Sequence, residues 1–234
     1  MAAETQVLVD NEKKYIAKFF SDASESDVKK VDLSTLSWAK HTITLSGAAS
    51  PNFKIGEVLT VGAEKYRVTG FTAGASTVEV VGWDNTNKKA TAIDASSSNG
   101  DAVSGGVSGN NTRTYSSIAE QDFNVLVTKI MWICNGLQVA IEWDGSGSEA
   151  YIAELIANGI WSMPAMEWPG IGINASGDSG DVLGDIQFST TGHASGDSYT
   201  VIMELKKQSG YDIPAYEQNN ILGYPVDYLL GNFT

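Results

Sequence analysis

The chain has 234 residues, of which 42% are hydrophobic, so it is long enough to form one large domain or two small ones around an apolar core. Its 28 acidic and 15 basic residues give a formal net charge of −13, which argues against direct binding to DNA or RNA, since such binding needs a basic patch. One cysteine cannot form an internal disulfide, and one cysteine with two histidines is too few for a zinc site.

The composition favours an all-β protein. Twenty-four glycines and only five prolines, set among many Ser, Thr, Asn, Val and Ile residues, are typical of short strands joined by tight turns. The acidic residues are scattered through predicted turns, which indicates a solvated surface or, alternatively, an acidic face for a basic partner. The charged N-terminus has no apolar run for a secretory signal, and no segment reaches the roughly 18 apolar residues of a membrane span. We therefore expect a protein made in a cytoplasm that does not enter a membrane.

The first predicted elements lie before Trp38. In residues 5 to 20, the alternation of Tyr15, Ala17 and Phe19 with charged or apolar neighbours favours a strand, although a helix fits nearly as well. Polar turn residues follow, and the apolar residues between 28 and 36 then suit either a short strand or a single helical turn.

From residue 38 to 114 the pattern changes, which predicts an inserted small β-barrel-like domain. Three segments, 41 to 47, 57 to 71 and 76 to 83, alternate β-branched with polar residues and end at Gly, Asn or Ser. Residues 85 to 112 are rich in Ser, Gly and Asn and are predicted to form an exposed, partly mobile loop.

The segments on either side of the insertion are expected to close one domain. Residues 1 to 37 hold too few apolar residues to fold alone, whereas 115 to 207 have plenty. We predict a discontinuous antiparallel β-sandwich, jelly-roll-like, because a surface loop tolerates an inserted module.

Asn135-Gly136 is the strongest local signal in the chain. An Asn-Gly pair between alternating hydrophobic residues predicts a two-residue hairpin with a type I′ turn. That pairing would put Cys134 opposite Leu137 on an apolar, buried face. On the same face it would pair Trp132 with Val139, Ile130 with Ile141 and Thr128 with Trp143, and on the other face Lys129 with Glu142.

A second hairpin is predicted between residues 186 to 190 and 199 to 205, joined by a flexible loop from Thr191 to Ser198. Between the two hairpins, Ala150 to Ile156 is the best helical candidate, with a strand equally allowed. The loop after it is expected to be anchored by Trp161 and Trp168.

The last 27 residues, 208 to 234, contain aromatic side chains without a regular period. An extended arm suits this pattern, lying either on this domain or on a neighbouring subunit. The possible interface residues are Tyr211, Tyr216, Tyr224, Tyr228 and Phe233.

The sequence contains no residue pattern that predicts a catalytic residue or a cofactor site. His41 and His193 have no Ser, Cys or carboxylate motif around them, and Cys134 lacks basic neighbours, so it is predicted to be a buried structural thiol. The acidic, Gly-rich loop with Asp178, Asp181 and Asp185 is a possible calcium site, although its spacing misses the EF-hand pattern and a solvated turn is favoured.

The frame of the chain resembles virion structural proteins of tailed bacteriophages, particularly marine and cyanophage-like viruses. The resemblance covers residues 5 to 37 and 115 to 211, through the strand patterns of QVLVDNEKKYIAKFF, VTKIMWICNGLQVAIEWDG and GDIQFSTTGHASGDSYTVIMELKK. The inserted segment FKIGEVLTVGAEKYRVTGF also looks like small β modules common in such proteins. The chain departs from the pattern in its insertion and in its longer C-terminal arm.

The resemblance implies a compact β-sandwich that assembles on a particle without catalysis. We therefore expect a capsid decoration protein located in the virion, which binds the major capsid protein or other virion proteins and forms homo-oligomers, with a trimer as a guess. The alternatives are a neck, tail or baseplate component, or a module that binds carbohydrate or the host surface through Trp83, Phe71 or the loop at 161 to 168. A hydrolase that uses scattered carboxylates is the third hypothesis.

Overall fold

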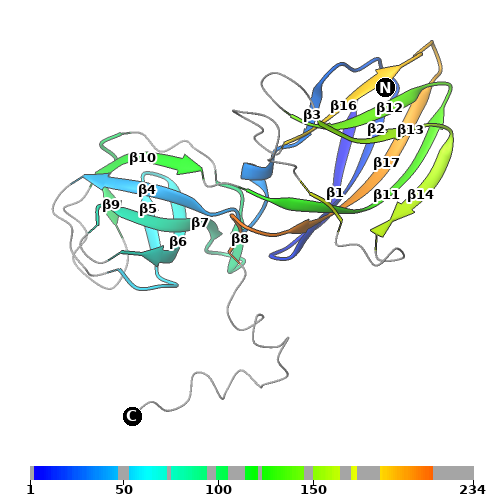
Figure 1. Cartoon of the computed structure of the whole chain (residues 1–234). Helices are drawn as coiled ribbons and strands as arrows, with labels where there is room; N and C mark the ends of the chain where they lie inside the picture. Colours follow the sequence, from blue (N-terminus) through cyan, green and yellow to red (C-terminus); the bar gives the residue numbers. More distant parts are fainter. Residues whose placement is uncertain are drawn as a thin grey trace.

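The computed structural model describes residues 3–46, 53–72, 75–93, 99–104, 114–120, 123–144, 150–163, 170–172 and 185–212. Within these ranges all regular elements are strands except η1 (Leu33–Thr35), a 3-10 turn, so the predicted all-β class with several antiparallel sheets is confirmed. None of the described segments forms a helix that is long and apolar enough to cross a membrane. The chain folds into two bodies that lie side by side (Figure 1).

Two sheets form the larger body. The first, called here sheet A, has the order β1 (Glu4–Asp10), β2 (Lys14–Ser21), β17 (Ser198–Lys207), β11 (Val125–Asn135) and β14 (Asn158–Ser162), with β15 (Ile171–Gly172) also paired to β11. The second, sheet B, has the order β13 (Ala150–Leu155), β12 (Gln138–Trp143), β16 (Ile186–Thr191) and β3 (Val28–Val31). All strand pairs in both sheets are antiparallel.

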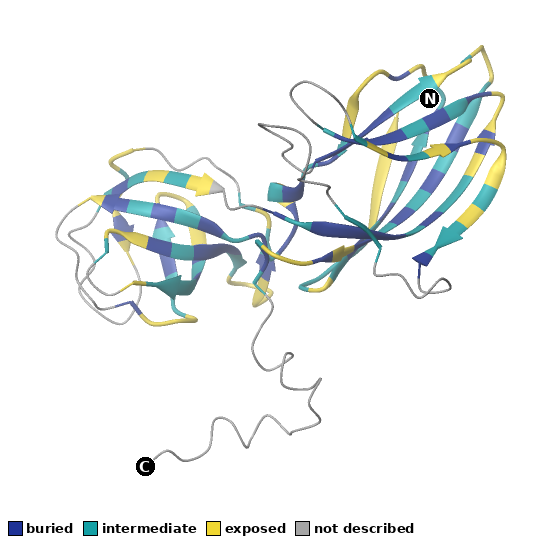
Figure 2. Ribbon diagram, in the orientation of Figure 1, coloured by how far each residue is buried: buried dark blue, intermediate teal, exposed yellow. Residues whose placement is uncertain are grey.

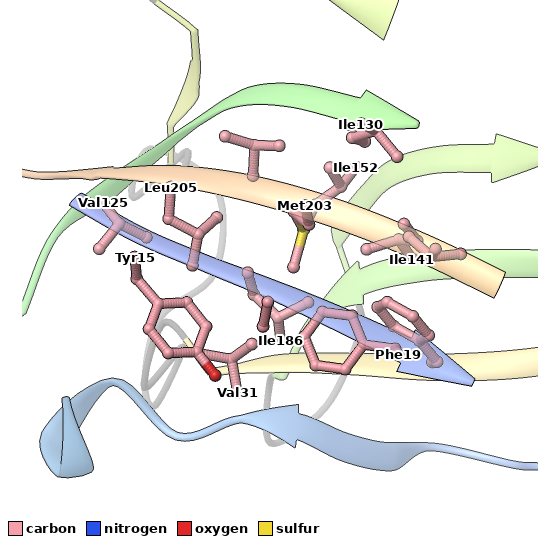
Figure 3. Close-up of a cluster of buried hydrophobic side chains, with 14 of the residues drawn as sticks. Tyr15, Phe19, Val31, Val125, Ile130, Ile141, Ile152, Ile186, Met203 and Leu205 are labelled. Atoms are coloured by element: carbon pink, nitrogen blue, oxygen red, sulfur yellow. The ribbon is translucent and has the colours of Figure 1, made fainter. Parts of the chain in front are cut away.

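The inner faces of sheets A and B enclose one hydrophobic core. Alternate residues of strands such as β2 and β17 point inward, and the ring of Phe19 in β2 contacts that of Phe188 in β16 edge-on, with 5.2 Å between the ring centres. Figure 3 shows side chains of this core converging from both sheets. Its buried members include Tyr15, Ile130, Ile141, Ile152, Ile186, Met203 and Leu205.

Both predicted hairpins are wrong. The Asn135-Gly136 turn joins β11 in sheet A to β12 in sheet B, and the loop after Thr191 joins β16 in sheet B to β17 in sheet A. A type I′ turn needs positive φ at both central residues, but of this pair only Gly136 has it, at 81°. The chain therefore crosses between the sheets at both places.

The residues predicted to face the core nevertheless do so. Cys134, Leu137, Val139, Ile141 and Trp143 are all buried, because a turn that crosses between two facing sheets also directs these alternate residues inward. The expected Lys129–Glu142 pair does not form across a hairpin, since Lys129 lies opposite Glu204 of β17.

The ambiguous segments have definite outcomes. The stretch from Lys14 is a strand, β2, and the stretch from 28 to 36 contains both a strand, β3, and the turn η1. The helical candidate at 150 to 156 is instead the strand β13. Asp32 caps η1, because its side chain accepts the backbone N–H of Ser34 at 3.0 Å.

The smaller body is built on a third sheet. Its order is β10 (Thr114–Glu120), β4 (His41–Ser46), β7 (Thr77–Asp84), β6 (Glu64–Phe71), β5 (Val58–Val61) and β9 (Val103–Ser104), with β8 (Lys89–Thr91) paired to β7. It has its own core, which includes Ile43, Leu59, Tyr66, Val80 and Val103. Residues 115 to 120, expected in the sandwich, pair with β4 in this sheet. The other predicted domain limits stay predictions.

The two bodies meet where residues 38 to 40 run beside 210 to 212. Lys40 donates its N–H to Gly210 O at 2.8 Å and Asp212 donates to Trp38 O at 2.9 Å. Trp38 has positive φ, 67°, and its ring lies edge-on to Trp83 of β7, with 6.5 Å between ring centres. The junction is therefore made of both backbone and aromatic contacts.

A buried lysine joins three segments of the larger body close to this junction. The side chain of Lys207 is fully buried, and its Nζ lies 2.6 Å from Asp10 Oδ1 and 2.5 Å from Ser37 O. Burial lowers the pKa of Lys207, and the Asp10 carboxylate opposes that change. These bonds tie the end of β17 to the end of β1 and to the segment after η1.

We expect Asp10→Ala to lower the free energy of unfolding by about 2–4 kcal/mol, because it leaves the Lys207 amine buried beside a carbonyl alone. Lys207→Met should cost less, and the double variant should be more stable than Asp10→Ala. Urea unfolding of the three variants measures this, and equal losses in Asp10→Ala and in the double variant would contradict it.

The core tyrosines predict alkaline sensitivity. Burial raises the pKa of Tyr15 to about 12 and also raises the pKa values of Tyr199 and Tyr211. In the unfolded chain the tyrosine hydroxyl ionises near pH 10, whereas in the folded chain these three hydroxyls stay protonated to a higher pH. Above about pH 10, ionisation therefore favours the unfolded state over the folded state.

We therefore expect stability to be unaffected by these groups below about pH 10 and to fall above it, by up to about 1.4 kcal/mol per pH unit for each such tyrosine. Absorbance of tyrosinate during a pH titration, compared with circular dichroism, tests this. Ionisation of all nine tyrosines near pH 10 without unfolding would contradict it.

Candidate functional site

Tyr211 of the predicted arm is part of this chain's own fold. It is buried, donates its hydroxyl to Leu33 O at 3.0 Å, and its ring centre lies 5.4 Å from that of Phe123. This contact agrees with an arm that begins on its own domain. The other possible interface residues, Tyr216, Tyr224, Tyr228 and Phe233, lie outside the described residues, and their role stays a prediction.

The possible calcium ligand Asp185 has a structural partner instead. It is buried, and its Oδ2 lies 2.5 Å from Lys29 Nζ while its Oδ1 accepts the N–H of Leu33 at 2.8 Å. Burial raises the pKa of Asp185, and these two bonds oppose the rise. Asp178 and Asp181 lie outside the described residues. Among the described residues, no group of three or more His, Cys, Asp and Glu side chains is arranged to hold a metal.

Both histidines contact backbone carbonyls. His41 is buried with Nδ1 at 3.3 Å from Ala39 O, and His193 places Nε2 at 3.1 Å from Asp22 O. These contacts support a loop near His193 and the segment that leads to the junction near His41.

Cys134 is buried, as predicted. It lies opposite Tyr199 in the β11–β17 ladder, and burial raises the pKa of its thiol. Cys134 packs in the hydrophobic core between sheets A and B, and a thiol with a raised pKa is a poor nucleophile.

The outer face of sheet A is different from every site above, because it presents apolar side chains to solvent. The register places Ile160, Met131, Ile202, Lys18 and Gln6 in one row across the strands and Ile133, Thr200, Phe20 and Glu4 in the next. We call these two rows the outer face. They run from edge strand β14 to edge strand β1, which has five exposed residues of seven (Figure 2).

Two hollows lie in the outer face. One, of about 290 Å³, is lined by Met131, Ile133, Ile160 and Ile202 together with polar residues of β14 and β17. The other, of about 240 Å³, is lined by Glu4, Gln6, Lys18 and Phe20. Because Lys18 lies opposite Ile202 in the register, the hollows adjoin across the β2–β17 ladder.

Two isoleucines of the outer face expose a large fraction of their surface to solvent. Ile133 keeps 62% of its surface accessible and Ile160 keeps 67%. Covering an isoleucine fully is worth about 1.5–3 kcal/mol, so a partner that covers both gains a substantial driving force.

Lysines border the apolar rows. Lys14, Lys18, Lys129 and Lys206 point to the same side as the outer face, against the acidic Glu4 and Glu204. Lys206 lies opposite Lys14, and Lys129 lies opposite Glu204. A chain with net charge −13 therefore has a local basic excess around its apolar sheet face.

The indole of Trp132 stabilises the position of edge strand β14. Trp132 packs against Gly159, where a Cβ atom would collide with the ring, and its Nε1 donates to Ile156 O at 3.1 Å. An aromatic side chain across an edge glycine stabilises the register of the edge strand. Trp132 thus keeps Ile160 in line with Met131.

The proposed sugar-binding aromatics of the smaller body are largely engaged. Trp83 packs against the Arg67 guanidinium, 5.0 Å from its ring centre, and the ring of Phe71 contacts that of Phe53. A hollow of about 310 Å³ beside Trp83 is lined by polar residues that include Asp84, Asn85 and Thr86. The loop at 161 to 168 lies mostly outside the described residues.

The arrangement of the outer face suits binding rather than reaction. Open apolar rows with shallow hollows can bury a partner segment, and the side chains that line the larger hollow carry no ionisable group. This surface was not among the sites expected from the sequence. Its signal is β11, VLVTKIMWICN, which is apolar on both faces and therefore typical of a strand covered on both sides.

Comparisons with known proteins do not show a family for this chain. No family model and no curated protein matches the chain. One solved structure, named "Complete structure of manganese lipoxygenase of Gaeumannomyces graminis and partial structure of zonadhesin of Komagataella pastoris", is 8% identical, with 86% of this chain and 79% of that chain covered. Its TM-score of 0.15 is too low to carry an argument about the fold or the function.

We expect Cys134→Ser to lower the free energy of unfolding by about 1–3 kcal/mol, because it places an unpaired hydroxyl in the core. Cys134→Ala is the matched control that removes the sulfur without adding a hydroxyl. Urea unfolding measures the difference between the two variants. The native thiol should also react slowly with a thiol reagent, and rapid labelling would show that Cys134 faces solvent.

Proposed function

We propose that this protein is a non-enzymatic structural protein of a tailed-bacteriophage virion, which decorates the capsid and stabilises the head. The observation that carries the proposal is the outer face of sheet A, which presents two exposed isoleucines and two adjoining hollows. The opposite face of the same sheet packs on a continuous hydrophobic core. The resemblance of the strand patterns to those of virion structural proteins is the reason that we assign this surface to assembly of a virion.

The mechanism is the addition of many weak contacts. Each copy would bury its outer face within the assembly, and the homo-oligomers would bind the major capsid protein or other virion proteins through several equivalent surfaces together. Because a shell displays many equivalent sites, small contacts per copy add up to a large resistance to expansion. No covalent chemistry and no cofactor take part.

Two finer features of the architecture belong to this proposal. A jelly-roll order for the larger body is supported by the chain crossing between sheets at 135–138 and 191–198. Barrel closure of the smaller body is supported by two backbone bonds, in which Gly100 donates its N–H to Tyr115 O and Tyr115 donates its N–H to Asp101 O, and by the Ala102–Thr114 bridge. They connect strand β10 to the segment before β9.

The same surface could serve in the neck, tail or baseplate, which changes the location and not the class of function. A second class, binding of carbohydrate or the host surface, is favoured by the polar hollow beside Trp83 in the smaller body. Glycan arrays probed with the isolated protein distinguish it, since a decoration protein is expected to bind shells and to leave the glycans unbound.

Copy number in purified virions, measured by quantitative mass spectrometry, tests the proposal. Decoration of the capsid predicts on the order of hundreds of copies per particle, since weak contacts must act together. About a dozen copies or fewer would indicate the neck or baseplate, whose rings hold few subunits. Absence from the particles would contradict the proposal in both forms.

A further inference from the structure

The outer face of sheet A needs an occupant, and the chain itself supplies a matching sequence. Residues 213 to 234 follow Asp212 and read IPAYEQNNILGYPVDYLLGNFT. Within them, residues 221 to 230 contain Ile221, Leu222, Tyr224, Val226, Tyr228, Leu229 and Leu230. We propose that this segment of one copy binds in the hollows of the outer face of a second copy, so that the protein assembles by exchange of its C-terminal segment.

Apolar complementarity is the first support. The larger hollow is lined by Met131, Ile133, Ile160 and Ile202, and it is open to solvent in the described part of the chain. A segment with aliphatic and aromatic side chains close together can fill this larger hollow while its backbone crosses the strands.

Charge is the second support. Residues 213 to 234 contain the acidic Glu217 and Asp227 and no lysine or arginine. The side of sheet A that carries the outer face has four lysines against two glutamates, on a chain whose total charge is −13. The charge of this face therefore favours an acidic segment, although the chain as a whole is acidic.

Length is the third support. Ile133 lies eight residues beyond Val125, the residue of β11 opposite Lys207, which is about 26 Å along the strand. The 22 residues after Asp212 can span about 70 Å when extended, so the segment is long enough to leave its own subunit and cross a neighbour's face. Such a contact joins two different surfaces, and repetition closes a ring or extends a row.

This inference rests on the proposed function in one respect. An assembly protein needs contacts between copies, whereas a segment folded back on its own outer face would remove the surface from assembly. Exchange between copies is therefore the arrangement that agrees with a multi-copy role.

Complementation between two full-length variants tests the exchange. The face variant carries Ile133→Lys and Ile160→Lys, and the segment variant carries Leu229→Lys and Leu230→Lys. We expect the wild-type protein to associate in sedimentation velocity and each variant alone to associate at least about tenfold more weakly. An equal mixture of the two variants should restore a dimer, because it contains one intact face and one intact segment.

The control variant carries Ile55→Lys and Tyr151→Lys, which place the same charges at positions 72% and 69% exposed outside the outer face. It should associate as the wild type does, and thermal unfolding should show that all variants fold. A wild-type protein that stays monomeric, or a mixture of variants that stays monomeric while the wild type associates, would overturn the inference. Presence in virions without self-association would overturn it alone, while self-association without presence in virions would overturn the proposed function alone.

Discussion

The ladder between β11 and β17 is the contact on which both faces of sheet A depend. It pairs ten residues of β11, from Val125 opposite Lys207 to Asn135 opposite Ser198. Because side chains alternate, this one register sends Ile130 and Cys134 to the core and Met131 and Ile133 to the outer face. A shift of one residue would exchange the two sets, so the core and the candidate binding surface are set together.

The sequence predicts the faces of these strands better than their partners. Cys134, Leu137 and Ile141 are buried as expected, since alternation is a local property of the chain. The Asn135-Gly136 pair predicts a hairpin, yet β11 and β12 find partners in different sheets, because their pairing depends on segments far away in sequence, β17 for β11 and β16 for β12. Local turn chemistry cannot tell a turn within a sheet from one that crosses between sheets.

The candidate site was predictable only in part. The apolar residues of β11 on both faces indicate a second covered surface, but the hollows need β14, β17 and β2 beside it, which only the register provides. Trp132 over Gly159 is likewise invisible in the sequence, because the two residues lie 27 positions apart and meet through edge pairing. The sequence left open whether the arm that begins with Tyr211 lies on its own domain or on a neighbouring subunit, and the structure places Tyr211 in the chain's own core.

Whether protein covers the outer face of sheet A in the assembled state can be measured. Hydroxyl-radical labelling of Met131, Ile133 and Ile160, read by mass spectrometry in the dilute free protein and in the intact particle, tests this most directly. Labelling of these three residues is expected to fall severalfold in the particle, while labelling of Ile55 and Tyr151 changes less. Equal labelling of the three residues in the two states would contradict it.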